Sequence, residues 1–289
     1  MPKPRDITHA VKAVRPLPEV AHRVLRMVQE PDWDIARLVE IVRTEPTLVA
    51  RILRLCNSAG IGLEREIASI GDAISYVGSR TLVQLVLVTC SAGMFRGIRG
   101  SCYADPTTTW HHAVACALAS QAVATRTGAV PPANAFTAGI LHDVGKIVIA
   151  DSLSEADVVA ALDCADSTHP ADHAALERMV FGIDHAEAAS VVAAAWKLPE
   201  WLTHALRAHH DRTLLGGDAA MPAVLHVADQ LALQAGIGNP FPRVPADVDE
   251  AAMERLELGP DDLEDLSQRL HADVSAAADL LNLEPAPGR

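Results

Sequence analysis

The chain has 289 residues, of which 49% are hydrophobic and only 3% aromatic, so it can bury a sizeable core of small aliphatic side chains, which favours helix packing over a β-sandwich. Its formal net charge of −13 disfavours binding to nucleic acids, because an acidic surface repels phosphates. No apolar run approaches the roughly 20 residues of a membrane helix, and the five cysteines have no zinc-knuckle spacing. We therefore expect an all-α, cytoplasmic protein with reduced thiols and no membrane segment.

The N-terminal third predicts a layer of short amphipathic helices. Residues 1–13 are expected to be mobile, and 14–96 to form a helical subdomain. Ser69 and Ser79 are candidate caps for its last two helices. Apolar residues spaced three and four apart predict the earlier helices, over about 20–28, 35–42 and 48–56.

A second helical subdomain is expected over residues 107–282. The stretch Gly97 to Thr109 mixes Gly, Ser, Asp and Pro without periodicity, so it is expected to connect the two parts. The tail 283–289 is expected to be disordered. Apolar periodicity and breaking residues predict helices over 110–127, 133–150, 155–165, 172–180, 185–195, 199–210, 220–235, 248–256 and 260–281.

Histidines are concentrated in this second part. Ten of the 13 lie between His111 and His226, and imidazole together with carboxylate suits Fe, Mn, Ni or Zn better than Mg or Ca. In the segment Gly-Ile-Leu-His-Asp-Val-Gly-Lys, the pair His142-Asp143 interrupts an otherwise apolar predicted helix, where an unpaired charge is costly to bury. A metal ion, or a buried hydrogen-bonded His/Asp network, would compensate that cost.

Several short motifs lie along the chain. They are Leu17-Pro18-Glu19-Val20, Glu45-Pro46-Thr47-Leu48, Leu55-Cys56-Asn57-Ser58, Trp110-His111-His112, the segment 139–146, Phe181 to His185, Trp196-Lys197-Leu198-Pro199, His209-His210 and Ala228-Asp229. Together they resemble the HD metallophosphohydrolase superfamily, in the form that its HDOD (HD-related output domain) subfamily carries. The resemblance covers about residues 14–282. It implies a multi-helix HDOD fold, with an N-terminal helical layer packed on an HD-superfamily helical bundle.

The resemblance also implies a mononuclear or dinuclear site for a divalent transition metal, with Fe or Mn favoured, Zn or Ni as further candidates, and no metal if the site is vestigial. Lys146 would face a substrate phosphate and, with Asp143, would be catalytic if the protein is an enzyme. The spacing of His142 and Lys146 predicts one shared helix face. The implied ligands are His112, His142, Asp143 and Asp229 for the first ion, and His185, His209 and His210 for a second.

Adjacent histidines need not both serve the site. His111 and His112 lie about 100° apart on a helix, and we favour His112 as the inward one. His226 fits a core histidine or a partner that supports a ligand. The remaining histidines that we assign to the surface are His22, His169, His173, His204 and His271.

Two departures separate the chain from the cyclic-dinucleotide phosphodiesterase branch. No Gly-Tyr-Pro loop follows His209-His210, and Thr108 replaces a glutamate four residues before His112. HDOD proteins are regarded as regulatory or output modules. The leading hypothesis is therefore a bacterial signal-transduction module with a His/Asp metal-binding pocket, which acts by binding an unidentified signalling protein or a ligand such as a nucleotide.

The alternative is a metal-dependent phosphohydrolase or phosphodiesterase acting on a nucleotide or a cyclic dinucleotide. The sequence leaves open whether the protein is an enzyme. A DNA-binding regulator is disfavoured, because the C-terminal part is acidic and has no convincing recognition helix.

Overall fold

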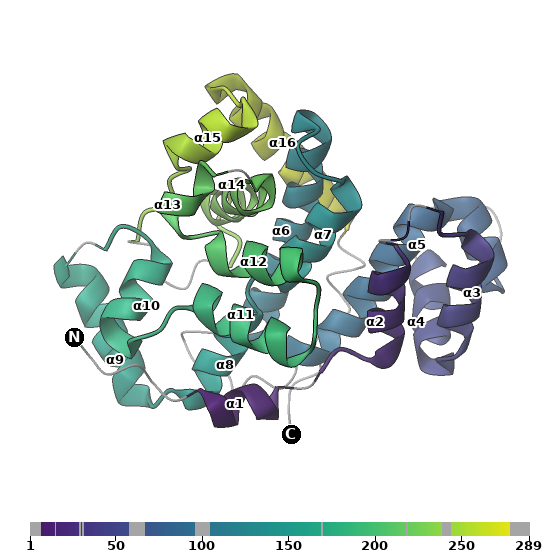
Figure 1. The fold of residues 1–289 in the computed structure, drawn as a ribbon, viewed down its shortest axis with the longest axis horizontal. Helices are drawn as coiled ribbons and strands as arrows, with labels where there is room; N and C mark the ends of the chain where they lie inside the picture. The colour runs from purple at the N-terminus through teal and green to yellow at the C-terminus, as the bar shows by residue number, and fades with distance from the viewer. Residues whose placement is uncertain are drawn as a thin grey trace.

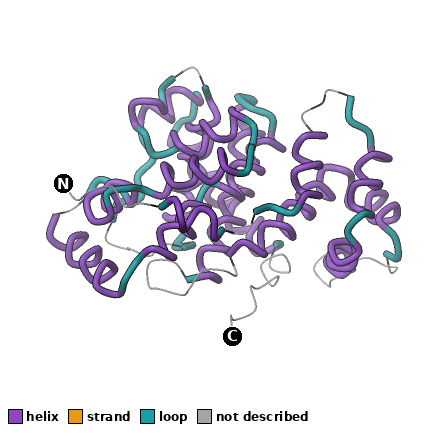
Figure 2. Tube along the Cα trace, turned by 60° about the horizontal axis from the view of Figure 1, so that its bottom comes forward, coloured by secondary structure: helices purple, strands orange, loops and turns teal. Residues whose placement is uncertain are grey.

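The structure is a computed structural model, and the regular secondary structure of its described part is all helix, joined by loops (Figures 1 and 2). It describes residues 7–14, 16–28, 30, 32–57, 67–95, 105–168, 170–217, 219–238 and 244–277, and none of these forms a strand. The first five helices are α1 (Thr8–Ala13), α2 (Glu19–Met27), α3 (Ile35–Arg43), α4 (Pro46–Cys56) and α5 (Ile70–Phe95). The others are α6 (Pro106–Thr127), α7 (Pro132–Leu141), α8 (Val144–Ser152), α9 (Glu155–Thr168), α10 (His173–Phe181), α11 (His185–Ala195), α12 (Glu200–Ala208), α13 (Arg212–Leu215), α14 (Ala220–Gln234), α15 (Glu250–Leu256) and α16 (Pro260–Ala276). The all-α expectation is confirmed.

Helices α2 to α4 form a small layer that packs on α5 (Figure 1). Each of these helices has an apolar stripe that faces the interior of the layer. Val24, Leu38 and Ile52 are fully buried there. Asp34 caps α3 by accepting a hydrogen bond from the Arg37 backbone N–H at 2.7 Å, and Pro46 occupies the first turn of α4. These are the start signals that a short helix needs.

Helix α5 connects this layer to the rest of the molecule. Ser69 caps it, because its Oγ accepts from the Asp72 N–H at 3.0 Å. Gly78 breaks the helix with φ 80° and ψ 161°, a conformation that glycine adopts without a steric penalty. By length and composition α5 could cross a membrane, but half of its most apolar window is buried. It contacts α4, α6 and α7, so it is a core helix of the domain.

The N-terminus differs from the expected mobile segment. Residues 8–13 form α1, which contacts α8 and α11 rather than the N-terminal layer. Ile7, Ala10, Val11 and Val14 are buried in that contact. The charged residues of this segment suggested a mobile chain, although its apolar residues form a short stripe. So short a helix becomes stable only by packing this stripe on helices that are distant in sequence. The expected disordered tail, 283–289, lies outside the described residues.

The larger body is built around α6, α7 and α14, with α11 and α12 beside them (Figure 1). Alanine is frequent on these helices, and Ala113, Ala117, Ala138 and Ala228 are fully buried. Small side chains allow helices to approach closely, which is why a core with few aromatic residues can still pack without large gaps.

The predicted helix 133–150 is wrong at one point, because it breaks into two. α7 ends at Leu141 and α8 begins at Val144. His142 and Asp143 therefore stand in the turn between two helices, so His142 and Lys146 do not lie on one continuous helix face as their spacing predicted. The helix α13, which follows Asp211 directly, was also not predicted; Asp211 caps it through the Thr213 N–H at 3.0 Å.

Candidate metal centre

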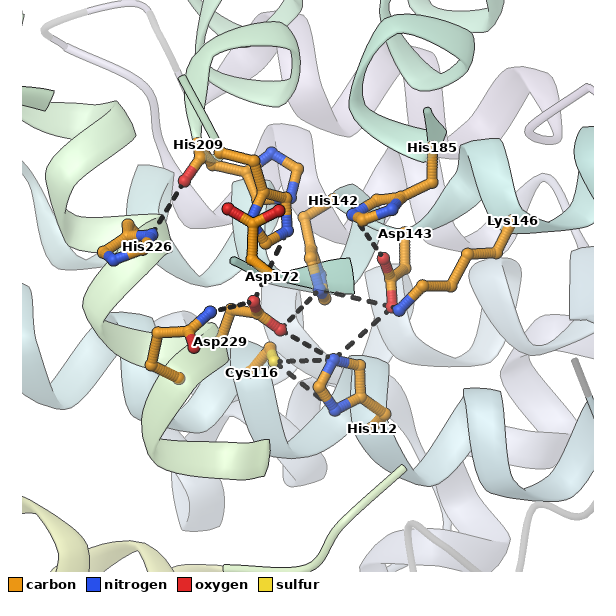
Figure 3. A network of polar contacts seen from close by, with 12 residues as sticks. His112, Cys116, His142, Asp143, Lys146, Asp172, His185, His209, His226 and Asp229 are labelled. Atoms are coloured by element: carbon orange, nitrogen blue, oxygen red, sulfur yellow. Dashed lines mark hydrogen bonds and ion pairs between the residues drawn. The ribbon is translucent and has the colours of Figure 1, made fainter. Parts of the chain in front are cut away.

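Five helical regions bring histidine and aspartate side chains to one buried place, and Figure 3 shows them converging. None of the predicted metal ligands is more than 5% exposed. They are His112 on α6, His142 and Asp143 between α7 and α8, His185 at the start of α11, His209 and His210 at the end of α12, and Asp229 on α14.

Glycines with close backbone contacts position these elements. A Cβ on Gly139 would lie 2.6 Å from the Ala117 Cα, so α7 packs directly on α6. A Cβ on Gly145 would lie 1.9 Å from the His185 carbonyl oxygen, so α8 packs directly on α11. The glycines on either side of His142-Asp143 thus allow this turn to pack closely between α6, which carries His112, and α11, which carries His185.

The first group of donor atoms surrounds Asp229. The His112 Nε2 lies 3.0 Å from the Asp229 Oδ1, and the His142 Nε2 lies 3.7 Å from the same oxygen. Both Nε2 atoms are 3.4 Å from the Asp143 Oδ2. The Cys116 Sγ, one turn after His112 on α6, is 3.5 Å from the His112 Nε2. Donor atoms of His112, Cys116, His142 and Asp229 all lie within 4.8 Å of one another.

The second group consists of His185, His209 and His210, whose nitrogens also lie within 4.8 Å of one another. Both aspartates reach toward it. The Asp143 Oδ1 is 3.5 Å from the His185 Nε2, and the Asp229 Oδ2 is 3.5 Å from the His210 Nε2. Each carboxylate therefore has one oxygen beside each group, an arrangement that suits two neighbouring cations.

Four of the five cluster imidazoles are held through Nδ1, which leaves Nε2 directed into the cluster. Nδ1 of His112, His142 and His209 contacts the carbonyl oxygen of Ile237 at 2.9 Å, Gly139 at 2.8 Å and Leu206 at 2.7 Å, respectively. A carbonyl can only accept, so each Nδ1 must donate, and in the neutral ring that a metal requires, Nε2 carries the lone pair. The Nε2 atoms of His142, His185 and His209 are buried with no hydrogen-bond partner among the described residues. Metal ligation would satisfy them, so the residues present fit a metal ion.

Electrostatics also favour a cation in the first group. Burial alone would lower the pKa of His112, but Cys116, Asp229 and Asp143 outweigh it and raise that pKa to about 10. Burial would raise the pKa of Asp229, but its hydrogen bond to His112 and the neighbouring His142 hold that pKa well below the usual range. The carboxylates thus favour positive charge at this place, and a bound divalent ion would supply it instead of protons on His112 and His142.

Two histidines of the second group have the opposite tendency. Burial, and then neighbouring histidines, lower the pKa of His209 and of His210 well below the usual range. These imidazoles are therefore neutral near pH 7, which is the protonation state that a metal requires of its ligands.

Two charged residues support the cluster from outside. The Lys146 Nζ donates to the Asp143 Oδ2 at 2.6 Å, and both side chains are buried. The Glu177 Oε2 accepts from the His185 Nδ1 at 2.7 Å and from the His185 backbone N–H at 2.6 Å. A carboxylate on Nδ1 orients a metal-binding imidazole and makes it more basic.

The structure brings all seven predicted ligands together; their role as ligands stays a prediction. His112 is the inward histidine of its pair, as expected. His226 supports its neighbours, with Nδ1 3.0 Å from the His209 oxygen and Nε2 accepting from the Asp249 N–H at 3.0 Å. The prediction that His173 lies on the surface is wrong, since it is 4% exposed, and His169 lies outside the described residues.

Sequence reasoning missed two residues of the cluster, Cys116 and Glu177. The spacing of Cys116 four residues after His112 could have revealed it, because such residues share a helix face. Glu177 had no comparable signal, since only the packing of α10 against α11 brings it to His185.

Comparison with known proteins now identifies the family. A model described as the HDOD domain matches residues 14–212. The chain belongs to the HDOD family. The matched range ends before Asp229, so this carboxylate is placed in the cluster by the fold of α14 and not by the family match.

Solved structures of other proteins have the same architecture. An HDOD domain protein of unknown function from Geobacter sulfurreducens matches with a TM-score of 0.75 and 24% identity, over 95% of this chain and 97% of that one. A Shewanella amazonensis protein provisionally named a phosphohydrolase matches with a TM-score of 0.70 and 25% identity, over 96% and 97%.

A curated relative is less informative. An uncharacterized protein of Treponema pallidum is 25% identical over 207 residues, which is 71% of this chain but only 39% of that protein. The chain thus matches well under half of the length of this relative.

Proposed function

We propose that this HDOD protein is a bacterial signal-transduction output module that acts in the cytoplasm and uses a metal-bound His/Asp pocket as a fixed internal support. The observation that carries this proposal is the burial of the predicted ligands, of which His210 alone lines the cavity described below. Every predicted ligand is at most 5% exposed, and Lys146 is 6% exposed. A hydrolytic metal needs an open coordination position that substrate can reach, whereas a structural metal needs none.

The metal would be held by His112, His142, Asp143 and Asp229, with His185, His209 and His210 available for a second ion. When bound, it would supply positive charge that ties the five helical regions together. The chain's own residues orient it: backbone carbonyls fix three imidazoles through Nδ1, and Glu177 fixes His185.

Metal analysis combined with a substrate screen tests this function. We expect purified protein to contain a transition metal and to hydrolyse neither phosphodiesters nor nucleotides. Asp143→Asn, which keeps the size of the side chain, should reduce metal content without changing a turnover that is already absent. Metal-dependent turnover that this variant loses would favour the phosphohydrolase instead. Protein without metal under any loading condition would leave only a hydrogen-bonded His/Asp network.

A cavity beside the cluster is the place where a ligand could act on the module. It has a volume of about 440 Å³ and lies between α10, α11, α12 and α13. The cavity reaches the cluster at His210, whose Nδ1 is buried and has no partner among the described residues. Its basic lining consists of Arg178, Arg207 and Arg212. Guanidinium groups bind phosphate in a bidentate way, so we propose a phosphorylated small molecule, such as a nucleotide, as its ligand.

Arg207 is the guanidinium that is free to bind this ligand. Arg178 pairs with Asp184, and the Arg212 Nη1 lies 3.3 Å from the Asp249 Oδ2. Arg207 forms no ion pair with any described residue. Three of the carboxylates that line the cavity are engaged by backbone N–H groups at helix starts, namely Asp172, Asp184 and Asp211.

Arg207→Gln tests the cavity. Loss of one hydrogen bond to a charged group costs about 1.5–3 kcal/mol, so we expect affinity for a nucleoside monophosphate to fall roughly 10-fold or more in calorimetric titration. Arg269→Gln is the matched control, because Arg269 is an exposed residue of α16 that pairs with Asp273 on the same helix. Equal affinities of the wild type and Arg207→Gln would contradict the proposal.

The alternative, a metal-dependent phosphohydrolase, is favoured by one feature. Lys146 is a buried cation next to Asp143, and a lysine beside a metal site is suited to binding phosphate. However, its ammonium group already contacts the Asp143 carboxylate at 2.6 Å. The substrate screen above decides between the two functions.

A further inference from the structure

Cys116 shares the inward face of α6 with His112, four residues away. Its side chain is 1% exposed, and its Sγ lies 3.5 Å from the His112 Nε2 and 3.9 Å from the His112 Nδ1. Figure 3 shows the sulfur directed into the same space as Asp229 and His142. A cysteine that only fills space in an apolar core would not be surrounded by imidazole and carboxylate groups. Packing alone therefore does not explain why a cysteine stands at this position.

The donor distances fit a tetrahedral ion. Zn–S and Zn–N bonds of about 2.3 Å and 2.0–2.1 Å place sulfur and nitrogen about 3.5 Å apart at a tetrahedral centre, and the Cys116 to His112 distance is 3.5 Å. By the same geometry, a nitrogen ligand and an oxygen ligand of one tetrahedral ion should be about 3.3 Å apart. The Asp229 Oδ1 lies 3.0 Å from the His112 Nε2 and 3.7 Å from the His142 Nε2, which brackets that value.

Asp143 is the competing fourth ligand for this ion. Its Oδ2 lies 3.4 Å from both Nε2 atoms, but the same oxygen accepts from the Lys146 Nζ at 2.6 Å. A buried ammonium group at that distance partly neutralises this oxygen and so makes it a weaker metal ligand. The other oxygen, Oδ1, has no hydrogen-bond partner among the described residues and lies beside His185. Asp143 is therefore better placed for the second group.

The kinds of donor atom in the first group decide which metal it would hold. Thiolate is a soft ligand that favours zinc and disfavours manganese and magnesium. Four protein ligands also close the coordination shell, as in structural zinc sites.

We propose that Cys116 is a metal ligand and completes a closed zinc site with His112, His142 and Asp229. This inference rests on the proposed function only in that the cluster holds a metal. It assigns the ion of the first group as zinc with a structural role, and it replaces Asp143 by Cys116 as the fourth ligand of that ion. Catalysis, if there were any, would have to use the second group.

Cobalt substitution tests the inference without an activity assay. Protein loaded with Co²⁺ should show a sulfur-to-cobalt charge-transfer band in the near ultraviolet. Cys116→Ser should lose this band, while Cys56→Ser, which alters a buried cysteine of α4 outside the cluster, should keep it. In chelator competition, Cys116→Ser should also bind Zn²⁺ more weakly by at least the roughly 10–100-fold that loss of a supporting partner causes.

X-ray absorption at the zinc edge of the wild-type protein provides a measurement that needs no variant. One sulfur scatterer at about 2.3 Å is expected. Wild-type protein that binds Co²⁺ or Zn²⁺ without sulfur in the coordination shell would overturn this inference and leave the proposed function intact. Wild-type protein that binds no transition metal would overturn both.

Discussion

The imidazoles of the cluster differ in what holds them, and this decides which supporting side chain matters most. His112, His142 and His209 use backbone carbonyl oxygens, which no side-chain substitution removes. His185 depends on a side chain, the buried carboxylate of Glu177. Burial would lower the pKa of His185, but Glu177 outweighs it, so that pKa is raised. The basicity of His185 as a ligand is thus set by one charge.

Glu177→Gln should weaken the second metal group selectively. The amide keeps a hydrogen-bond acceptor but removes the negative charge, and loss of such a supporting partner typically costs about 10–100-fold in metal affinity. We expect about 10-fold, measured by chelator competition. Glu187→Gln is the control, because Glu187 is an exposed residue of α11 near His185. An unchanged affinity in Glu177→Gln would show that His185 binds no metal.

At this scale the sequence predicted which histidines and aspartates converge, because the His-Asp motif and its apolar surroundings are local. It did not predict Cys116 or Glu177. Cys116 resembled any other buried cysteine until its distance to His112 was known, and Glu177 reaches His185 only through the fold. Residues that support a ligand from another helix leave no local pattern.

Among the elements, the turn between α7 and α8 has the most exacting geometry. It presents His142 to α6 and Asp143 to both α6 and α11. It can do so only because Gly139 and Gly145 allow the backbones to touch. Periodicity predicted one continuous helix here, since apolar residues continue on both sides of the turn. The energetic reason for the break is tertiary: the buried polar pair gains contacts with His112 and His185 that a regular helix would not give.

Gly145→Ala should therefore be strongly destabilising. Its Cβ would lie 1.9 Å from the His185 oxygen and 2.6 Å from the Ala189 nitrogen, so α8 and α11 would have to separate. Overpacking typically costs about 1–3 kcal/mol, and rigid backbone atoms on both sides favour the upper end. Denaturant unfolding of the metal-free protein measures this cost.

Gly93→Ala is the matched control on α5. No atom lies within 4 Å of the position of its Cβ, so a stabilisation of about 0.5–1 kcal/mol is expected from helix propensity. If the two substitutions change the free energy of unfolding equally, close contact between α8 and α11 is not what Gly145 provides.

For the molecule as a whole, the cluster connects parts of the chain that are far apart in sequence. His112 and Asp229 are 117 residues apart and meet at 3.0 Å. The general prediction of an all-α HDOD fold needed only periodicity and motifs. The position of α1 did not follow from them, because a six-residue helix has little stability of its own and is fixed by its contacts with α8 and α11. The subdomain boundaries at 14–96 and 107–282 stay predictions.

Removing the metal should lower the stability of the entire larger body. A metal that binds only the folded state contributes about 2.7 kcal/mol when its free concentration is 100 times Kd. For a chain of this size, each kcal/mol corresponds to roughly 2–4 °C in Tm, so a chelator should lower Tm by roughly 5–10 °C. Scanning calorimetry with and without chelator measures this shift. Asp229→Asn should lose most of it, because Asp229 has one oxygen beside each group. A bound metal would cross-link α6, α12 and α14, so its removal must lower the stability of their packing. A wild-type Tm that the chelator does not change would therefore mean that hydrogen bonds alone hold these helices together.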